Sequence, residues 1–274
     1  MSVQENAASR KFEGEPAVKP LLLAEDNLVN QKVALVLLEL LSLEAEVVNN
    51  GKEALAAVKS GSYSIILMDC HMPVMDGFQA TVAIRKYEAQ IGRYTPIIAV
   101  TALAMAGDRE RCIAAGMDDY IAKPIDREVL QEKISHWLRS DVVFKSRNII
   151  RKHLRADSAL TVLAGAPINL TQLEEFYEPQ DLREILDLFV GNTEAMLGRI
   201  KTSIEKKGHS ALAKIAHELK ASCSSIGAKQ MSKLCLCLEQ AAGQEDWLEA
   251  QETYLAIVRS FDEIRKYLQM AADN

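Results

Sequence analysis

The chain has 274 residues, of which 49% are hydrophobic and 26% are charged, and its formal net charge is −6. This composition is typical of a soluble globular protein with about two domains, and it excludes a fibrous or disordered chain. The acidic balance argues against nucleic-acid binding, because neutralising phosphates requires clustered Lys and Arg. Five cysteines without framework spacing favour the reducing cytoplasm over secretion. No stretch is apolar and long enough to predict a signal peptide or membrane insertion.

Between residues 19 and 140, short apolar runs alternate with longer stretches of helical spacing. The predicted strands are 21–24, 45–48, 64–68, 96–100 and 120–122. The helical stretches between them include 31–41, 53–59, 78–87 and 129–138. This alternation favours a parallel sheet covered on both faces, with right-handed crossovers. We therefore expect a doubly wound, five-stranded α/β domain over 19–140, preceded by a polar tail over 1–18.

After Ile168 the pattern is helical to the end of the chain. Four stretches carry apolar residues at steps of three and four, which indicates one buried stripe on each helix. They begin near Asp181, Leu212, Met231 and Trp247, and a shorter helix is expected near 171–177. Short joints between such helices predict an all-α antiparallel four-helix bundle over 167–274. The basic segment 141–166 is expected to be a helical connector, with a flexible linker as the open alternative.

Polar side chains follow four of the predicted strands at one edge of the sheet. Glu25 and Asp26 follow the first strand, and Asp69 follows the third. Thr101 follows the fourth strand, and Lys123 follows the fifth. Ligands of doubly wound sheets bind at this edge, beyond the carboxyl ends of the strands. We therefore expect these five side chains to converge there, although helix capping by Asp26 or by its neighbour stays an alternative.

Three crowded carboxylates raise one another's pKa unless a cation offsets them. A hard divalent cation such as Mg²⁺ prefers oxygen ligands of this kind and could hold a phosphoryl group. Asp69 is placed to act as the nucleophile, because carboxylates form acyl phosphates. Lys123 and Thr101 would then contact the other phosphoryl oxygens.

Four segments of this domain closely resemble the receiver domain of two-component response regulators. They are 22–27 (LLAEDN), 68–77 (MDCHMPVMDG), 100–102 (VTA) and 120–124 (YIAKP). The resemblance implies that Asp69 accepts phosphate from a phosphohistidine and that Lys123 contacts this phosphate. It implies that Thr101 and Tyr120 form the switch pair that responds to the phosphate. The implied Mg²⁺ ligands are Glu25, Asp26, Asp69 and the backbone carbonyl of His71.

A single histidine of the helical half lies away from the buried stripe of its helix. At about 100° per residue, His217 lies ~200° from both Ile215 and Leu219. Its ring is therefore expected to point to solvent, among small residues and with Lys220 one turn away. Neutral imidazole is a capable nucleophile near neutral pH, and Lys220 could offset phosphate charge. An idle surface histidine is the alternative that the residues alone leave open.

Residues 216–228 (AHELKASCSSIGA) resemble the motif of histidine phosphotransfer (HPt) domains. The resemblance extends over about 168–272. It implies that His217 is the phosphorylated residue, that Lys220 is its supporting charge, and that Gly227 allows a close helix joint. Ala221 departs from the glycine that the family usually carries, and we expect its methyl group to tighten the approach of a partner.

The two resemblances imply a two-component phosphorelay protein that accepts a phosphoryl group on Asp69 and relays it through His217. The implied partners are an upstream histidine kinase and a downstream receiver domain or response regulator. No phosphate-binding loop of the Gly-x-x-x-x-Gly-Lys-Ser/Thr type occurs, so we expect a phosphoryl carrier rather than a kinase. Because a short linker gives an effective concentration of about millimolar, transfer between the two residues within one chain is expected.

Two alternatives stay open. In the first, phosphorylation of Asp69 switches an interaction module, and the bundle binds a target without carrying phosphate. The second concerns the extent of the protein: Met1 and the polar start favour a free-standing protein over the C-terminal part of a hybrid sensor kinase.

Overall fold

The computed structural model describes residues 19–101, 108–138 and 166–272. The expected tail over 1–18 lies outside the described residues, as does all but the last residue of the expected connector over 141–166. The domain boundaries at these segments therefore stay predictions. None of the helices in the described ranges combines the length and hydropathy that a membrane span requires.

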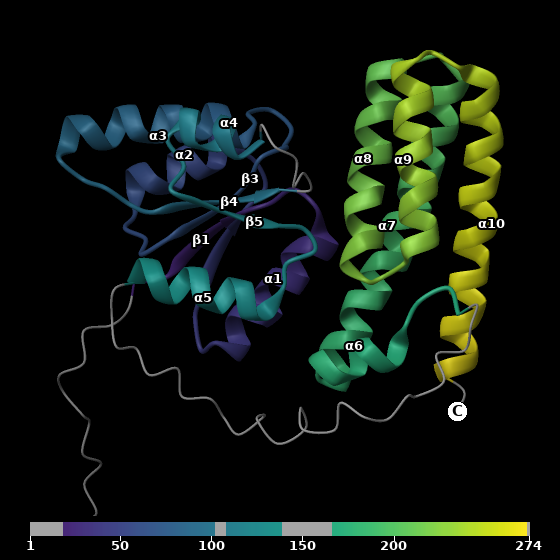
Figure 1. Cartoon of the computed structure of the whole chain (residues 1–274), viewed down its shortest axis with the longest axis horizontal. Helices are drawn as coiled ribbons and strands as arrows, with labels where there is room; N and C mark the ends of the chain where they lie inside the picture. Colours follow the sequence, from purple (N-terminus) through teal and green to yellow (C-terminus); the bar gives the residue numbers. More distant parts are fainter. Residues whose placement is uncertain (1–18, 102–107, 139–165, 273–274) are drawn as a thin grey trace, which may run out of the picture.

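The first module is a five-stranded parallel sheet with the strand order β2-β1-β3-β4-β5. Its strands are β1 (Leu21–Ala24), β2 (Ala45–Val48), β3 (Ile66–Asp69), β4 (Ile97–Thr101) and β5 (Asp119–Ala122). Its helices are α1 (Leu28–Leu40), α2 (Gly51–Ser60), α3 (Gly77–Ile91), α4 (Asp108–Ala115) and α5 (Arg127–Leu138). Figure 1 shows α1 and α5 on one face of the sheet and α2, α3 and α4 on the other. This confirms the predicted doubly wound α/β fold.

Both faces of the sheet are buried, which explains why its strands are almost continuously apolar. Leu21 and Leu23 of β1 pack into the core on the side of α1 and α5. Leu22 and Ala24 pack into a second core with α2 and α3. Successive side chains of a strand point to opposite faces, so one four-residue strand contributes to both cores.

Two strands run one residue further than their apolar pattern predicts. Asp69 is still in register with Val100, and Thr101 is in register with Ala122. Each is a polar residue at the last paired position, whereas the sequence pattern ends at the last apolar residue. This register places both side chains at the carboxyl edge of the sheet.

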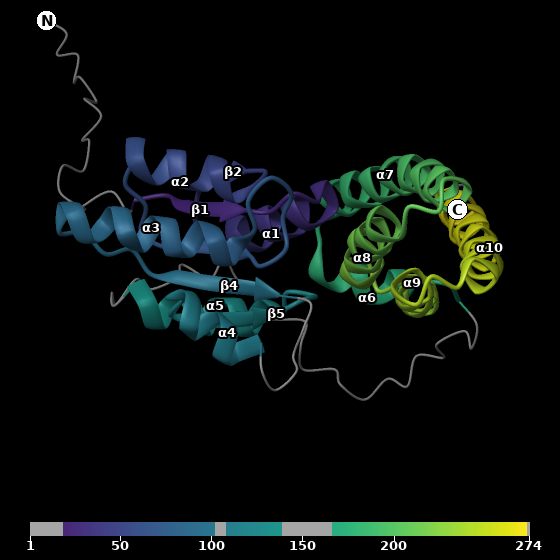
Figure 2. The ribbon, with the colours of Figure 1, turned by 90° about the horizontal axis from the view of Figure 1, so that it is seen from above.

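The second module is a four-helix bundle preceded by a short helix. Its elements are α6 (Leu170–Phe176), α7 (Pro179–Glu205), α8 (His209–Ser225), α9 (Lys229–Gly243) and α10 (Trp247–Ala272). Figure 2 shows α7 to α10 almost end-on, arranged around a common core. In that core the rings of Phe189 and Phe261 meet edge to face, with centroids 6.2 Å apart. The predicted bundle is confirmed.

The two modules pack against each other through α1, which contacts both α7 and α8 (Figures 1 and 2). The apolar core on the α1 side of the sheet is continuous with the core of the bundle. This packing brings the carboxyl edge of the sheet to the side of α8.

Candidate functional site

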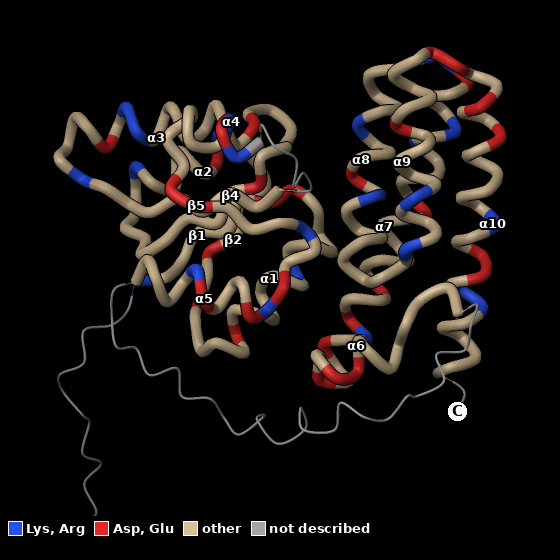
Figure 3. Tube along the Cα trace, viewed as in Figure 1, with Lys and Arg blue, Asp and Glu red and all other residues tan. Residues whose placement is uncertain are grey.

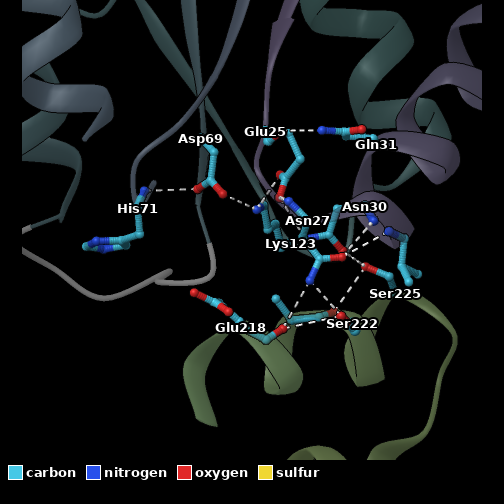
Figure 4. Close-up of polar contacts among 12 residues, drawn as sticks. Glu25, Asn27, Asn30, Gln31, Asp69, His71, Lys123, Glu218, Ser222 and Ser225 are labelled. Carbon is cyan, nitrogen blue, oxygen red and sulfur yellow. Dashed lines mark hydrogen bonds and ion pairs between the residues drawn. The ribbon is translucent and has the colours of Figure 1, made fainter. Parts of the chain in front are cut away.

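A pocket at the carboxyl edge of the sheet is lined by residues of both modules. The sheet module contributes Glu25, Asp26, Asn27, Asn30, Asp69, His71 and Lys123, and the bundle contributes His217, Glu218 and Ala221. Figure 4 shows the sheet residues facing α8. Residues that are far apart in the sequence therefore form one site.

The acidic side chains of the pocket gather around one buried lysine. Oxygens of Glu25, Asp26 and Asp69 all lie within 4.8 Å of one another. The Nζ atom of Lys123 donates to Glu25 Oε2 at 2.6 Å and to Asp69 Oδ2 at 2.7 Å. Burial alone would lower the pKa of Lys123, but the charges of the two carboxylates outweigh this effect and raise it. Lys123 is therefore a permanent cation that faces Asp69.

One lysine does not offset the whole negative charge of this cluster. Burial raises the pKa of Glu25 to about 7, although Lys123 opposes the rise. Burial, and next the charge of Asp69, raise the pKa of Asp26 to about 6. Carboxylates with raised pKa values, each offering an oxygen to one small space, fit a hard divalent cation such as Mg²⁺.

The remaining predicted residues of this module lie at different distances from the pocket. The backbone N–H of His71 donates to Asp69 Oδ1 at 3.1 Å. Thr101 ends β4 and is 3% exposed. Tyr120 is exposed and lines a separate hollow beside α4, with Arg109, Ile113 and Lys133. The structure thus brings the carboxylates and Lys123 together, places Thr101 at the end of the adjacent strand, and leaves Tyr120 outside the pocket.

The ring of His217 points out of its own bundle, as predicted, but the neighbouring module covers it. The side chain is 22% exposed, and the ring of His71 lies edge-on to it, with centroids 5.4 Å apart. Burial, and next the proximity of His217, lower the pKa of His71, so the ring of His71 is neutral near pH 7. The imidazole is therefore less exposed than its position on α8 alone would make it, because packing of the modules covers the solvent side.

A glutamate of α9 holds His217 and Lys220 together. Glu239 Oε1 lies 2.9 Å from Nδ1 of His217, and Glu239 Oε2 accepts from Nζ of Lys220 at 2.6 Å. Burial alone would raise the pKa of Glu239, but the hydrogen bonds from His217 and Lys220 lower it to about 2. A carboxylate only accepts hydrogen bonds, so the contact with Glu239 assigns a proton to Nδ1 of His217, and in the neutral ring Nε2 is then the nitrogen with a free lone pair.

We expect Glu239→Gln to slow phosphoryl transfer through His217 about tenfold, because the imidazole loses the partner that fixes its tautomer and orientation. The variant should also lose about 1 kcal/mol of stability at neutral pH, after allowance for solvent screening. A carboxylate with a lowered pKa stabilises the fold above about pH 4.5, and this contribution fades as the pH falls toward 2.

Denaturant unfolding of the wild type and of Glu239→Gln at pH 7 and at pH 3 measures this contribution. The difference in unfolding free energy should be larger at pH 7. Glu252→Gln, on the exposed face of α10, is the matched control. A difference that grows at pH 3 would contradict the assigned role of Glu239.

Two pairs of short polar side chains join α1 to α8 beside the pocket. The Nδ2 atom of Asn27 donates to Ser222 Oγ at 2.7 Å, and Ser225 Oγ donates to Asn30 Oδ1 at 2.8 Å (Figure 4). Asn27 is also the N-cap of α1, because its side-chain oxygen accepts from the backbone of Val29 and Asn30. Capping by Asn27 is thus confirmed, and the same side chain also contacts the bundle.

Two positions near the site favour glycine for different physical reasons. A Cβ at Gly77 would lie 2.1 Å from the backbone oxygen of Asp69, so only glycine lets α3 begin this close to β3. Gly227, at the joint of α8 and α9, has a φ of +71°, and a Cβ there would meet nothing within 4 Å. A left-handed backbone, rather than crowding, favours glycine in this short joint between α8 and α9. Ala221 is buried and lines the pocket.

A doubly wound sheet with three carboxylates and a lysine at its carboxyl edge, beside a four-helix bundle that presents a histidine, defines a receiver module joined to a phosphotransfer module. Family models give the same result: the response regulator receiver domain matches residues 21–135, and the Hpt domain matches residues 184–273. The chain is thus a receiver domain followed by an Hpt domain.

Relatives of the chain are hybrid histidine kinases. The hybrid signal transduction histidine kinase I of Dictyostelium discoideum is 45% identical over 120 residues, which cover 42% of this chain and 7% of that protein. The signal transduction histidine-protein kinase BarA of Shigella flexneri is 31% identical over 227 residues, which cover 80% of this chain and 23% of that protein. The chain therefore spans less than a quarter of the length of these relatives.

Among solved structures, the receiver domain of the sensor histidine kinase PA1611 from Pseudomonas aeruginosa PAO1 is similar to this chain. It was crystallised with a magnesium ion in its active site cleft. It is 46% identical, with a TM-score of 0.42, and the match covers 45% of this chain and 100% of that chain.

Proposed function

We propose that this chain is a phosphorelay carrier in which Asp69 and His217 hold the same phosphoryl group in turn. The observation that carries this proposal is that both side chains line one pocket, although 148 residues separate them in the sequence. Asp69 is fixed by the sheet and His217 by Glu239, so the two nucleophiles are held beside each other by rigid elements.

In the proposed transfer, a carboxylate oxygen of Asp69 attacks the phosphorus of a phosphohistidine on a kinase. The P–N bond breaks, and an acyl phosphate forms on Asp69. Nε2 of His217 then attacks this phosphorus, the P–O bond to Asp69 breaks, and the carboxylate is regenerated. Lys123 faces the oxygen atoms on which negative charge changes during transfer. It can stabilise this charge without reorganising. Every step is reversible, so the relative populations set the direction of transfer.

The acidic cluster is the proposed Mg²⁺ site, with Glu25, Asp26 and Asp69 as ligands and the backbone carbonyl of His71 as the fourth. When bound, the ion would neutralise negative charge on the phosphoryl oxygens. Thr101 and Tyr120 are the proposed switch pair, and Lys220 is the proposed supporting charge near His217.

The proposed partners are a histidine kinase upstream and a receiver domain or response regulator downstream. The two matched family models are phosphotransfer modules, and neither is a kinase domain. We propose that the chain acts as a carrier rather than an ATP-dependent enzyme. Its five cysteines are free and four of them are buried, which fits the reducing cytoplasm where we place this relay.

A labelling time course on the full chain tests the proposal, with radiolabelled acetyl phosphate as the donor to the receiver. Aspartyl phosphate is lost in alkali, whereas phosphohistidine survives alkali and is lost in acid, so the two products can be counted separately. We expect label on Asp69 first and on His217 later, at a rate that does not change on serial dilution of the protein. If aspartyl phosphate accumulates and phosphohistidine never forms, the relay is excluded and the bundle is an interaction module.

A further inference from the structure

The contact between the two modules includes one charged cluster that lies outside the phosphotransfer pocket. Lys32 of α1 donates to Asp181 Oδ1 at 3.1 Å and also lies 2.6 Å from Glu184 Oε2, both on α7. None of these three residues lines the pocket. They also fall outside the sequence motifs around Asp69 and His217.

The charges on the two sides of this contact are complementary. Lys32 is the one cation of α1. On the bundle side, Asp181 and Glu184 face Lys32, and the preceding residues of the chain carry further carboxylates: Glu174, Glu175 and Glu178. Figure 3 shows acidic positions, in red, gathered over α6 and the start of α7. Lys32 therefore lies opposite an acidic segment of the bundle, with which it forms two ion pairs.

The cluster is not needed to build either fold. The core residues of this part of α7 are Leu182 and Ile185, whereas the side chains of Asp181 and Glu184 are 27% and 49% exposed. The hydrogen bond to Glu184 is the main cause that raises the pKa of Lys32, and Lys32 in turn lowers the pKa of Glu184. The two modules thus interact through charges that each could lose without unfolding.

We propose that Lys32, with Asp181 and Glu184, is a recognition latch that selects this chain's own HPt domain as the partner of its receiver. The proposal rests on the proposed function, because it names what decides the destination of the phosphoryl group. The hydrogen bonds of Asn27 with Ser222, which is buried, and of Asn30 with Ser225, which is half-buried, set the position of α1 along α8. The latch adds electrostatic selectivity, which governs partner choice more than raw affinity. A second receiver that takes phosphate from His217 would then need a cation at the corresponding place on its first helix.

A partition experiment with full-length chains tests the latch. The donor is phosphorylated on Asp69 and can pass the label to its own His217 or to that of a second chain. The second chain carries Asp69→Asn, so it only accepts, together with Asp181→Lys and Glu184→Lys. A difference in tag mass separates the two products. With a wild-type donor, we expect the label to stay within the donor chain.

A Lys32→Glu donor should weaken this preference, because its own acidic α7 repels the introduced glutamate and the lysines of the second chain attract it. We expect the share of label on the second chain to rise about tenfold at low salt. The shift should shrink as the salt concentration rises, because the latch is partly exposed. Lys52→Glu, an exposed change of equal charge on α2, should leave the partition as in the wild type.

Equal partition with the Lys32→Glu and Lys52→Glu donors would overturn the latch. That result differs from failure of the relay itself, in which the wild-type donor passes no label to any His217. Circular dichroism of each variant verifies that both modules are folded before the partition is compared.

Discussion

Replacing Asp69 by asparagine should abolish phosphoryl labelling of the chain, including labelling of His217. The amide keeps the shape of the side chain but has no carboxylate oxygen that can form an acyl phosphate. Asp69 is also the residue that Lys123 contacts at 2.7 Å, so the substitution places a neutral group where the lysine otherwise faces an anion. Labelling with a cognate histidine kinase, followed by acid and alkaline treatment, measures both sites at once.

The His217→Gln variant should give the opposite labelling pattern, and it distinguishes the role of His217 from that of Asp69. It should be labelled on Asp69 to at least the wild-type level. The label should persist because the chain has lost the imidazole that would accept the phosphoryl group. Glu263→Gln, an exposed change on α10, is a control for the loss of one carboxylate. If His217 is labelled equally well in the Asp69→Asn chain, transfer within the chain is excluded and the two modules act separately.

Removal of divalent cations should have the second large effect. With a chelator present, we expect transfer to Asp69 to fall by at least about 100-fold, because the phosphoryl oxygens would meet uncompensated carboxylates. Mg²⁺ should also stabilise the folded receiver, by about 2.7 kcal/mol at a concentration 100 times its Kd. The thermal midpoint of the full chain, recorded with and without Mg²⁺ at matched ionic strength, measures this binding independently of transfer.

The Asp26→Asn variant tests whether the acidic cluster is the binding site. Without Mg²⁺ it should be at least as stable as the wild type, because it removes a carboxylate whose pKa is raised by burial and next by the charge of Asp69. With Mg²⁺ it should gain less than the wild type. Equal stabilisation of the two proteins by Mg²⁺ would show that the ion binds outside this cluster.

The local sequence determined the elements and the chemistry that each can carry. Four-residue apolar strands separated by helical spacing predict a parallel sheet, because a strand buried on both faces has no polar positions. The rule that ligands bind at the carboxyl ends of such strands then placed Glu25, Asp69 and Lys123 together without coordinates. In the second half of the chain, apolar residues spaced three and four apart predict the bundle, because burying one face of a helix imposes this spacing on its apolar residues.

Glu239 could not be found this way, because its function depends on α9 lying against α8. Its position after Leu238 looks like an ordinary exposed glutamate in the sequence, and no motif marks it. The contact with His217 depends on how two helices pack, and no periodic signal within one helix reports it. The same holds for Lys32, whose partners lie on α7, about 150 residues away.

The sequence by itself determined two modules and their folds and pointed to the two proposed nucleophiles, Asp69 and His217, because backbone hydrogen bonding and burial act over short stretches of chain. Only the tertiary structure decided that both of these side chains share one pocket, that a carboxylate contacts the imidazole, and that the modules meet through α1. These facts depend on the shapes and charges of surfaces formed after the chain has folded, and such surfaces combine residues that no local pattern connects.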